Sequence, residues 1–248
     1  PSLFRDFSAP VKLKFTYCES DLIHIAQHDE NDFNRWNAIT QLYQSWIFEL
    51  NDSINAQQPL TMDAHRVDVI RHILDDLSLD LSLKSHMLTL PAIQVMAENQ
   101  TTITPDTLNL AYYTLKKQIA TALRDRLLSE YQALPKAKYE LTQLDIHKRS
   151  YQGVLISYLG MIDDPTCQEI LWHQLTCSDN MTDQLSALRA ISNSHNQELY
   201  VTSLDYFHKQ WQSMPLVIDK WFAIQAMANQ PNVPEQIDRL MAHPSFDI

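Results

Sequence analysis

Apolar residues recur every three or four positions along most of the chain, which is the spacing of one face of an α-helix. The clearest example follows Asp32, where the apolar positions are Phe33, Trp36, Ile39, Leu42, Tyr43, Trp46, Ile47 and Leu50. We expect Asp32 to cap this helix. The same spacing predicts helices over Asp21–Gln27, Asp63–Leu77, Leu79–Leu90, one long helix over Thr104–Leu134, Asp145–Ile162, Pro165–Thr176 and Pro234–Ala242. Pro91 is expected to begin a further short helix as a first-turn proline.

The segment from Ser178 to Asn229 predicts three amphipathic helices in succession. In the first, we expect Asn180 to cap the helix and Asp183 to reach back as a variant of the capping box. The third is apolar over more than half of its circumference. A helix of that kind is buried between neighbours, so we expect it to be a central helix of the array. Its apolar positions are Val217, Ile218, Trp221, Phe222, Ile224, Met227 and Ala228.

One short segment has the pattern of a β-strand. From Ala9 to Tyr17, apolar residues alternate with Lys12, Lys14 and Thr16, the period of a half-buried strand. No second strand is predicted, so its partner sheet is expected in a β-rich domain upstream. We therefore divide the chain into a terminal strand or linker (residues 1–17) and a helical domain (residues 18–248), with a subdivision near residues 135–140.

Glycine is scarce, which favours helices over sheets. The chain has only two glycines, Gly153 and Gly160, whereas hairpin turns and bulges of sheet-rich folds need this residue. The helix lengths suggest pairs of helices that repeat about every 35 residues, the period of helical repeat proteins. The sequence thus predicts an all-α fold of stacked helix pairs in a solenoid-like superhelical array, preceded by the orphan strand.

Charge and cysteine content exclude some functions. The net charge of −11 argues against a nucleic-acid partner, because phosphate binding needs clustered Lys and Arg. No run of 18 apolar residues predicts a membrane span. Cys18, Cys167 and Cys177 are odd in number and lack the spacing of a metal site. We interpret them as reduced thiols of a cytoplasmic protein.

Two arrangements of reactive side chains deserve comparison with plainer interpretations. His24 and His28 have the i, i+4 spacing that can chelate a metal on a helix, but no third ligand is evident and the segment fits a solvated helix end. Cys167 or Cys177 with His173 offers a thiol near a base. Nothing in the sequence supplies the oxyanion-stabilising groups that such a nucleophile needs, so neither arrangement predicts a site.

Two motifs carry a family resemblance. D-N-M-T-D-x-L-x-A-L begins at Asp179, and I-D-K-W-F-x-x-Q-A begins at Ile218. Together they resemble the C-terminal helical domain of the bacterial aminopeptidase N family (membrane alanyl aminopeptidases), which are zinc metallopeptidases. P-S-L-F-R-D-F-S-A-P-V-K-L at the start and H-P-S-F near the end are also similar to that family, so the resemblance covers the whole chain.

The resemblance implies an enzyme whose catalytic residues lie elsewhere in the polypeptide. The family's zinc site needs H-E-x-x-H, and its substrate's amine is held by G-x-M-E-N. None of the ten histidines is followed by Glu, and neither glycine opens the second motif. We expect no catalytic, cofactor-binding or metal-binding residue in this chain. Zinc would be held by a separate catalytic domain. The helical domain would cover that catalytic domain and restrict the access of peptide substrates to it.

By the same resemblance, the partners are the upstream β-rich and catalytic domains of one polypeptide, with no nucleic acid and no membrane. Asn180, Asp183 and Lys220 are the candidates for channel or interdomain contacts. The alternative is a free-standing helical-repeat scaffold that binds other proteins. The orphan strand argues against this alternative, because it implies that a sheet is missing.

Overall fold

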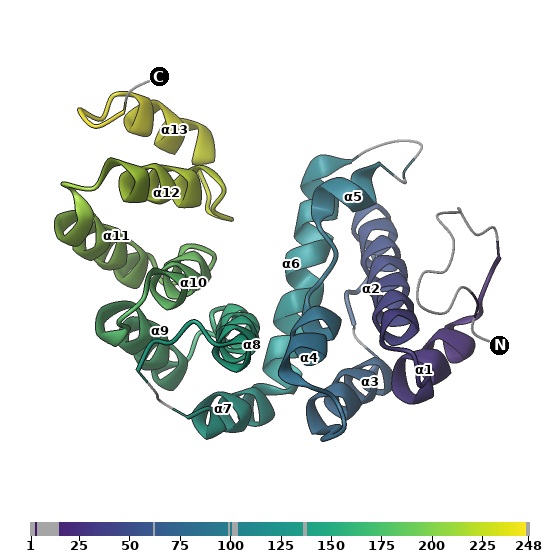
Figure 1. Ribbon diagram of the computed structural model, residues 1–248. Helices are drawn as coiled ribbons and strands as arrows, with labels where there is room; N and C mark the ends of the chain where they lie inside the picture. Colours follow the sequence, from purple (N-terminus) through teal and green to yellow (C-terminus); the bar gives the residue numbers. More distant parts are fainter. Residues whose placement is uncertain are drawn as a thin grey trace. The chain divides into compact units, whose positions relative to one another are not determined.

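The regular structure is helical throughout the part of the chain that the computed structural model describes, which comprises residues 3, 15–61, 63–98, 100, 104–135 and 138–246. This confirms the predicted all-α class. The predicted strand Ala9–Tyr17 lies mostly outside the described residues, and residues 15–17 have no regular secondary structure. The helices are α1 (Glu19–His28), α2 (Asp32–Asn55), α3 (Ala64–Asp75), α4 (Leu81–Leu88), α5 (Ile93–Ala97), α6 (Pro105–Ala122), α7 (Arg124–Ala133), α8 (Gln143–Leu159), α9 (Pro165–Cys177), α10 (Met181–Ser192), α11 (Gln197–Trp211), α12 (Pro215–Ala226) and α13 (Val233–Met241) (Figure 1).

Asn and Asp side chains begin many of these helices, in place of glycine-containing turns. Asp80 accepts a hydrogen bond from the backbone N–H of Leu83 at 2.8 Å. Asn196 accepts one from Leu199 at 2.9 Å. Such caps satisfy backbone donors that lack a partner within the helix. The prediction that Asp32 caps α2 is wrong. Asp32 is the first residue of the helix, and Asn31 before it is the cap.

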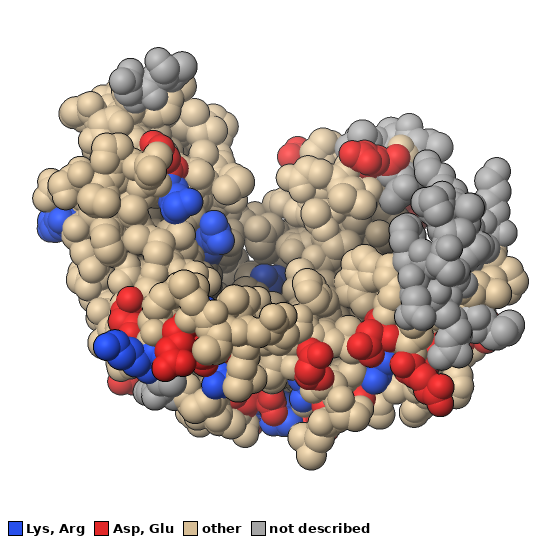
Figure 2. Space-filling model, in the orientation of Figure 1, with Lys and Arg blue, Asp and Glu red and all other residues tan. Residues whose placement is uncertain are grey.

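The chain divides into two compact units, Pro1–Arg126 and Leu127–Ile248, and the boundary falls within α7. The segment near residues 135–140, where the sequence predicts a subdivision, lies in the second unit, and that subdivision stays a prediction. Among the described helices, none is both long and apolar enough to cross a bilayer. On the face shown in Figure 2, Lys and Arg lie scattered among Asp and Glu.

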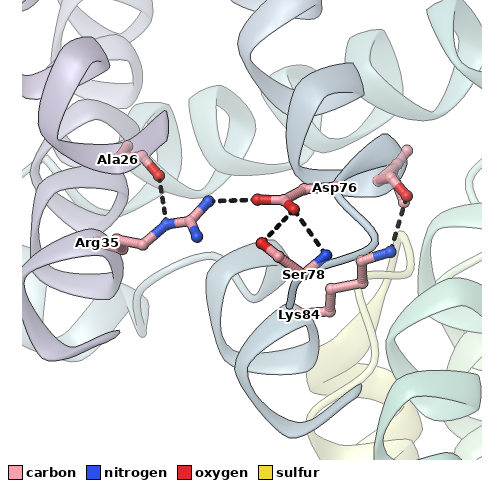
Figure 3. Close-up of polar contacts among 6 residues, drawn as sticks. Ala26, Arg35, Asp76, Ser78 and Lys84 are labelled. Carbon is pink, nitrogen blue, oxygen red and sulfur yellow. Dashed lines mark hydrogen bonds and ion pairs between the residues drawn. The ribbon is translucent and has the colours of Figure 1, made fainter. Parts of the chain in front are cut away.

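The first unit is assembled around α2, which packs against α1, α4 and α6. The Tyr43 and Trp46 side chains at its centre are fully buried. Nearer the start of α2, Arg35 donates from Nε to the carbonyl oxygen of Ala26 at 3.0 Å and from Nη2 to Asp76 at 2.8 Å (Figure 3). Asp76 follows α3, so this one side chain joins α2 to the ends of α1 and α3.

The second unit is assembled around α10, which packs against α8, α9, α11 and α12. Along the chain, helices from α8 to α13 lie side by side in succession (Figure 1). Gly160 at the end of α8 makes one close approach possible, because a Cβ there would lie 2.8 Å from the carbonyl oxygen of Ala190 on α10. The stacked-helix prediction is therefore confirmed, with α10 at the centre.

The prediction that the third helix of the 178–229 segment is central is wrong. On α12, Ile218, Trp221 and Ile224 are buried, whereas Leu216 is 79% and Met227 is 70% exposed. Its neighbours α10, α11 and α13 cover only part of its circumference. Apolar periodicity identifies the side chains that burial would stabilise, but it does not show whether a neighbouring helix covers each of them.

Two further predictions about helix boundaries are wrong. The long helix over Thr104–Leu134 is interrupted at Leu123, so α6 and α7 are separate. Leu123 is itself buried, and the apolar spacing therefore continues through the break. Pro91 does not begin a helix, because α5 begins at Ile93 with Ala92 as its N-cap.

Candidate functional site

A hollow of about 300 Å³ lies in the second unit, at the N-terminus of α10. We call it the α10 pocket. Its walls come from the end of α7, from Pro135, Lys138 and Tyr139, from α8 and α9, and from the first turn of α10. The lining residues are Tyr131, Leu134, Pro135, Lys138, Tyr139, Asp145, Lys148, Arg149, Gln152, His173, Gln174, Cys177, Ser178, Asp179, Asn180 and Asp183.

Asn180 and Asp183 lie together in this pocket. The predicted cap is confirmed, since the side-chain oxygen of Asn180 accepts from the backbone N–H of Asp183 at 2.9 Å. The carboxylate of Asp183 does reach back, but to the side-chain amide of Asn180, from which its Oδ2 accepts at 2.8 Å. A capping box would join it to the backbone N–H of the cap. The two side chains thus bind each other and fix the entry to α10.

Asp183 is 8% exposed, and its Oδ1 has no hydrogen-bond partner among the described residues. Burial raises the pKa of Asp183, while the hydrogen bond from Asn180 and the charge of Arg149 act in the opposite direction. Burial disfavours the ionised form because the protein interior solvates charge less well than water does. One oxygen of the carboxylate therefore lacks a donor that would stabilise its charge.

Gln174 on α9 forms the floor of the pocket and is 2% exposed. Its Oε1 accepts from the hydroxyl of Tyr131 at 2.8 Å and from Nε2 of Gln152 at 2.9 Å. Its Nε2 donates to the carbonyl oxygen of Asp183 at 3.1 Å and to the hydroxyl of Ser186 at 2.8 Å. One amide therefore joins α7, α8, α9 and α10. Burial raises the pKa of Tyr131 to about 12, because the phenolate would be poorly solvated there.

Sequence reasoning missed Gln174, although a signal was present. It lies three residues after Leu171, a position of the buried face of α9. A polar residue on an apolar face is expected to hold buried hydrogen bonds, since an unpaired buried amide is costly.

Cationic side chains from α8 complete the wall. Lys148 pairs with Asp145 at 3.1 Å. Arg149 donates from Nη1 to the carbonyl oxygen of Glu140 at 3.0 Å, and its guanidinium lies 4.7 Å from the ring centroid of Tyr139. Both cations are therefore engaged by groups at the rim.

The remaining sequence candidates lie apart. Lys220 is exposed on α12 and does not line the α10 pocket. His173 and Cys177 line it, whereas Cys167 is buried within the second unit. In the first unit, the rings of His24 and His28 lie 5.1 Å apart, centroid to centroid. Within the described ranges, no three His, Cys, Asp or Glu side chains are placed to hold a metal ion, so these residues do not fit a zinc site.

The chain is similar in sequence to known aminopeptidases. Aminopeptidase N of Escherichia coli is 34% identical over 247 residues, which cover 99% of this chain and 28% of that protein. Aminopeptidase N of Haemophilus influenzae is 32% identical over 247 residues, covering 100% of this chain and 28% of that protein. The chain thus spans little more than a quarter of the length of these relatives. The predicted resemblance to the aminopeptidase N family is confirmed.

A solved structure agrees with this result. The crystal structure of Legionella pneumophila aminopeptidase A in complex with aspartic acid matches with a TM-score of 0.82 and 27% sequence identity, over 99% of this chain and 29% of that one. A family described as "Domain of unknown function (DUF3458_C) ARM repeats" matches residues 19–248. The chain therefore belongs to this family of ARM-repeat domains.

Proposed function

We propose that this chain is the C-terminal helical domain of a zinc-dependent aminopeptidase, and that it limits access to the active site of that enzyme without taking part in the chemistry. The observation that carries the proposal is the similarity over the whole chain to two aminopeptidases N, of which it spans 28%. The chain has no H-E-x-x-H sequence, so zinc and the catalytic groups would belong to another domain of the same polypeptide.

In this role, the helices act by exclusion. A wall over the catalytic domain would admit peptide ends and keep folded proteins out, and it would also shield the reacting groups from water. The strand Ala9–Tyr17 would pair with a β-rich domain upstream. Lys220 is proposed as an interdomain contact, which is supported by its exposure beside Leu216, a large apolar residue that is 79% exposed. Asn180 and Asp183 are proposed to line the substrate channel.

The free thiols of Cys18, Cys167 and Cys177 support a cytoplasmic location for this enzyme, because reducing compartments keep thiols unpaired. Substrates would be peptides with a free N-terminus.

Activity of the full-length protein is the first test. We expect release of the N-terminal residue from an alanyl peptide, loss of this activity with a zinc chelator, and recovery when zinc is restored. The chain of residues 1–248 alone should give no activity above a mock preparation, with or without zinc. Zinc-dependent cleavage by this chain alone would contradict the non-catalytic role. A full-length protein that lacks peptidase activity and binds other proteins would favour the alternative, a helical-repeat scaffold.

The exclusion role needs a separate measurement. The full-length protein should cleave a short alanyl peptide much faster than the same peptide fused through a short linker to a folded protein. A version without residues 18–248 that retains activity on the short peptide should lose this discrimination. If both substrates are cleaved at similar rates by the full-length protein, the domain does not restrict access.

A further inference from the structure

Three carboxylates line the α10 pocket, and two of them have partners for both oxygens. Asp145 is paired with Lys148 at 3.1 Å. Asp179 accepts from the backbone N–H of Tyr139 at 2.9 Å. Asp183 differs, because only its Oδ2 has a partner and its Oδ1 has none among the described residues.

Burial makes the missing hydrogen bond at Oδ1 of Asp183 energetically costly. Asp183 is 8% exposed, so water does not replace the missing donor freely, and a buried acceptor without a donor loses the hydrogen bonds it would have in solution. Arg149 carries a compensating charge, but its side chain is held by the carbonyl oxygen of Glu140 and the ring of Tyr139. A donor that also carries positive charge would satisfy Oδ1 best.

Hydrogen bonds within the protein hold the backbone carbonyl of Asp183 and one of its carboxylate oxygens in place without a ligand. Its backbone carbonyl accepts from Gln174, which also holds Tyr131 and Gln152. Its Oδ2 is held by the cap residue Asn180. The hollow of about 300 Å³ is at the small end of the range for small-molecule sites. A fixed carboxylate at the wall of a hollow of this size is suited to a small organic cation.

We infer that the α10 pocket binds a small molecule with a protonated primary amine, whose ammonium group donates a hydrogen bond to the carboxylate of Asp183. An ammonium is compact and carries three donors, whereas a guanidinium is a broad planar fork. The compact group suits an oxygen that neighbouring side chains screen from solvent, and these side chains must move apart as the ligand enters. The site lies wholly within the second unit and does not depend on the peptidase activity proposed above.

Benzylamine and benzyl alcohol form a matched pair of probes, since they have similar size and differ in charge. Binding of each is measured by calorimetry with the full-length protein and with Asp183→Asn, which keeps the shape of the side chain and removes its charge. Loss of a charged hydrogen bond should weaken benzylamine binding by about tenfold or more. Benzyl alcohol should bind weakly to both proteins. Any amine site elsewhere in the polypeptide is common to both proteins and cancels in the comparison.

Asp179→Asn is the control variant, because it removes the same charge from the same pocket at a carboxylate that already has partners. It should weaken benzylamine binding clearly less than Asp183→Asn does, because only the longer-range attraction between the two charges is lost. Equal affinities of the unmodified protein and Asp183→Asn would overturn the inference, as would equal affinities for the amine and the alcohol.

Crystals of the unmodified full-length protein, soaked with meta-bromobenzylamine, give a direct reading that does not depend on whether a variant folds. The bromine should give an anomalous peak in the α10 pocket with the amine nitrogen within hydrogen-bond distance of Asp183. An α10 pocket without such a peak, at a concentration that saturates binding in solution, would also overturn the inference.

Discussion

Trp221 of α12 donates its indole N–H to the backbone carbonyl oxygen of Leu204 on α11, at 3.0 Å. The ring also contacts His208 of α11 and His243 beyond α13, with centroid distances of 5.0 and 5.4 Å. This one side chain therefore joins α12 to α11 and to the segment that follows α13, by a buried hydrogen bond and by packing.

Trp221→Ala should lower the free energy of unfolding by about 3–5 kcal/mol, because it empties a buried aromatic site. Trp221→Phe keeps most of the apolar volume and loses the hydrogen bond, so its cost should be clearly smaller. Urea unfolding of the three proteins measures both effects. A loss below about 1 kcal/mol for the alanine variant would show that α12 contributes little to the core.

Asp76→Asn should destabilise the first unit by about 3 kcal/mol at neutral pH, because it breaks a largely buried pair with Arg35. Burial alone raises the pKa of Asp76, but hydrogen bonds from Ser78 and Arg35 outweigh it and hold this pKa well below its usual 3.8. The stability from the ionised carboxylate is therefore present above about pH 4 and decreases as the pH falls.

The difference between Asp76→Asn and the unmodified protein should accordingly shrink in acid. Denaturant unfolding between pH 3 and pH 7 measures it. The same difference at all pH values would show that the carboxylate charge does not stabilise the fold.

Gly160→Ala should destabilise the second unit by about 1–3 kcal/mol, the usual cost of excess volume in a packed region. The added Cβ would lie 2.8 Å from the backbone oxygen of Ala190, which cannot move without shifting α10. Gly153→Ala is the matched control, since its Cβ would lie 3.7 Å from that of Ser186. Within helix α8 it should be neutral or stabilising by up to about 1 kcal/mol. Thermal unfolding of both variants decides whether the close approach is real.

Asp183→Asn should change the pH dependence of stability in the direction opposite to that of Asp76→Asn. Burial raises the pKa of Asp183 above 3.8, so the folded state binds a proton more tightly than the unfolded state does. The stability contributed by this proton is complete below about pH 4 and is lost as the pH rises through the raised pKa. Relative to the unmodified protein, the variant should gain stability over this range. A constant difference between pH 3 and pH 7 would show that Asp183 titrates normally.

The sequence predicts local structure well where a single helix determines it. Asn180 caps α10 as expected, since the donor that it satisfies lies three residues away. Pro105 begins α6 for a similarly local reason, because its ring fixes a helical backbone angle and it lacks a donor. Leu123 shows the limit of this reasoning, since a buried residue can continue the apolar period through a break between two helices.

Features that depend on neighbouring helices were harder to predict from the sequence. The exposure of Leu216 and Met227 depends on which helices surround α12, and the helical pattern carries no such information. The α10 pocket combines residues from α7 to α10. The sequence proposed only Asn180 and Asp183 as contacts there, whereas His173 and Cys177 were considered as a catalytic pair and set aside. Lys220 is close in sequence to Trp221 but points to a different face, which shows that proximity along a helix does not place side chains together.

The four hydrogen bonds of Gln174 have a consequence for motion. Partners on α7, α8 and α10 share one amide on α9, so separation of any of these segments from α9 costs that amide at least one buried hydrogen bond. Partial opening that releases only one segment is therefore disfavoured relative to opening of the set. The slowest-exchanging backbone amides of these helices should lose their protection together as denaturant is added, and α13, which does not contact Gln174, should exchange earlier.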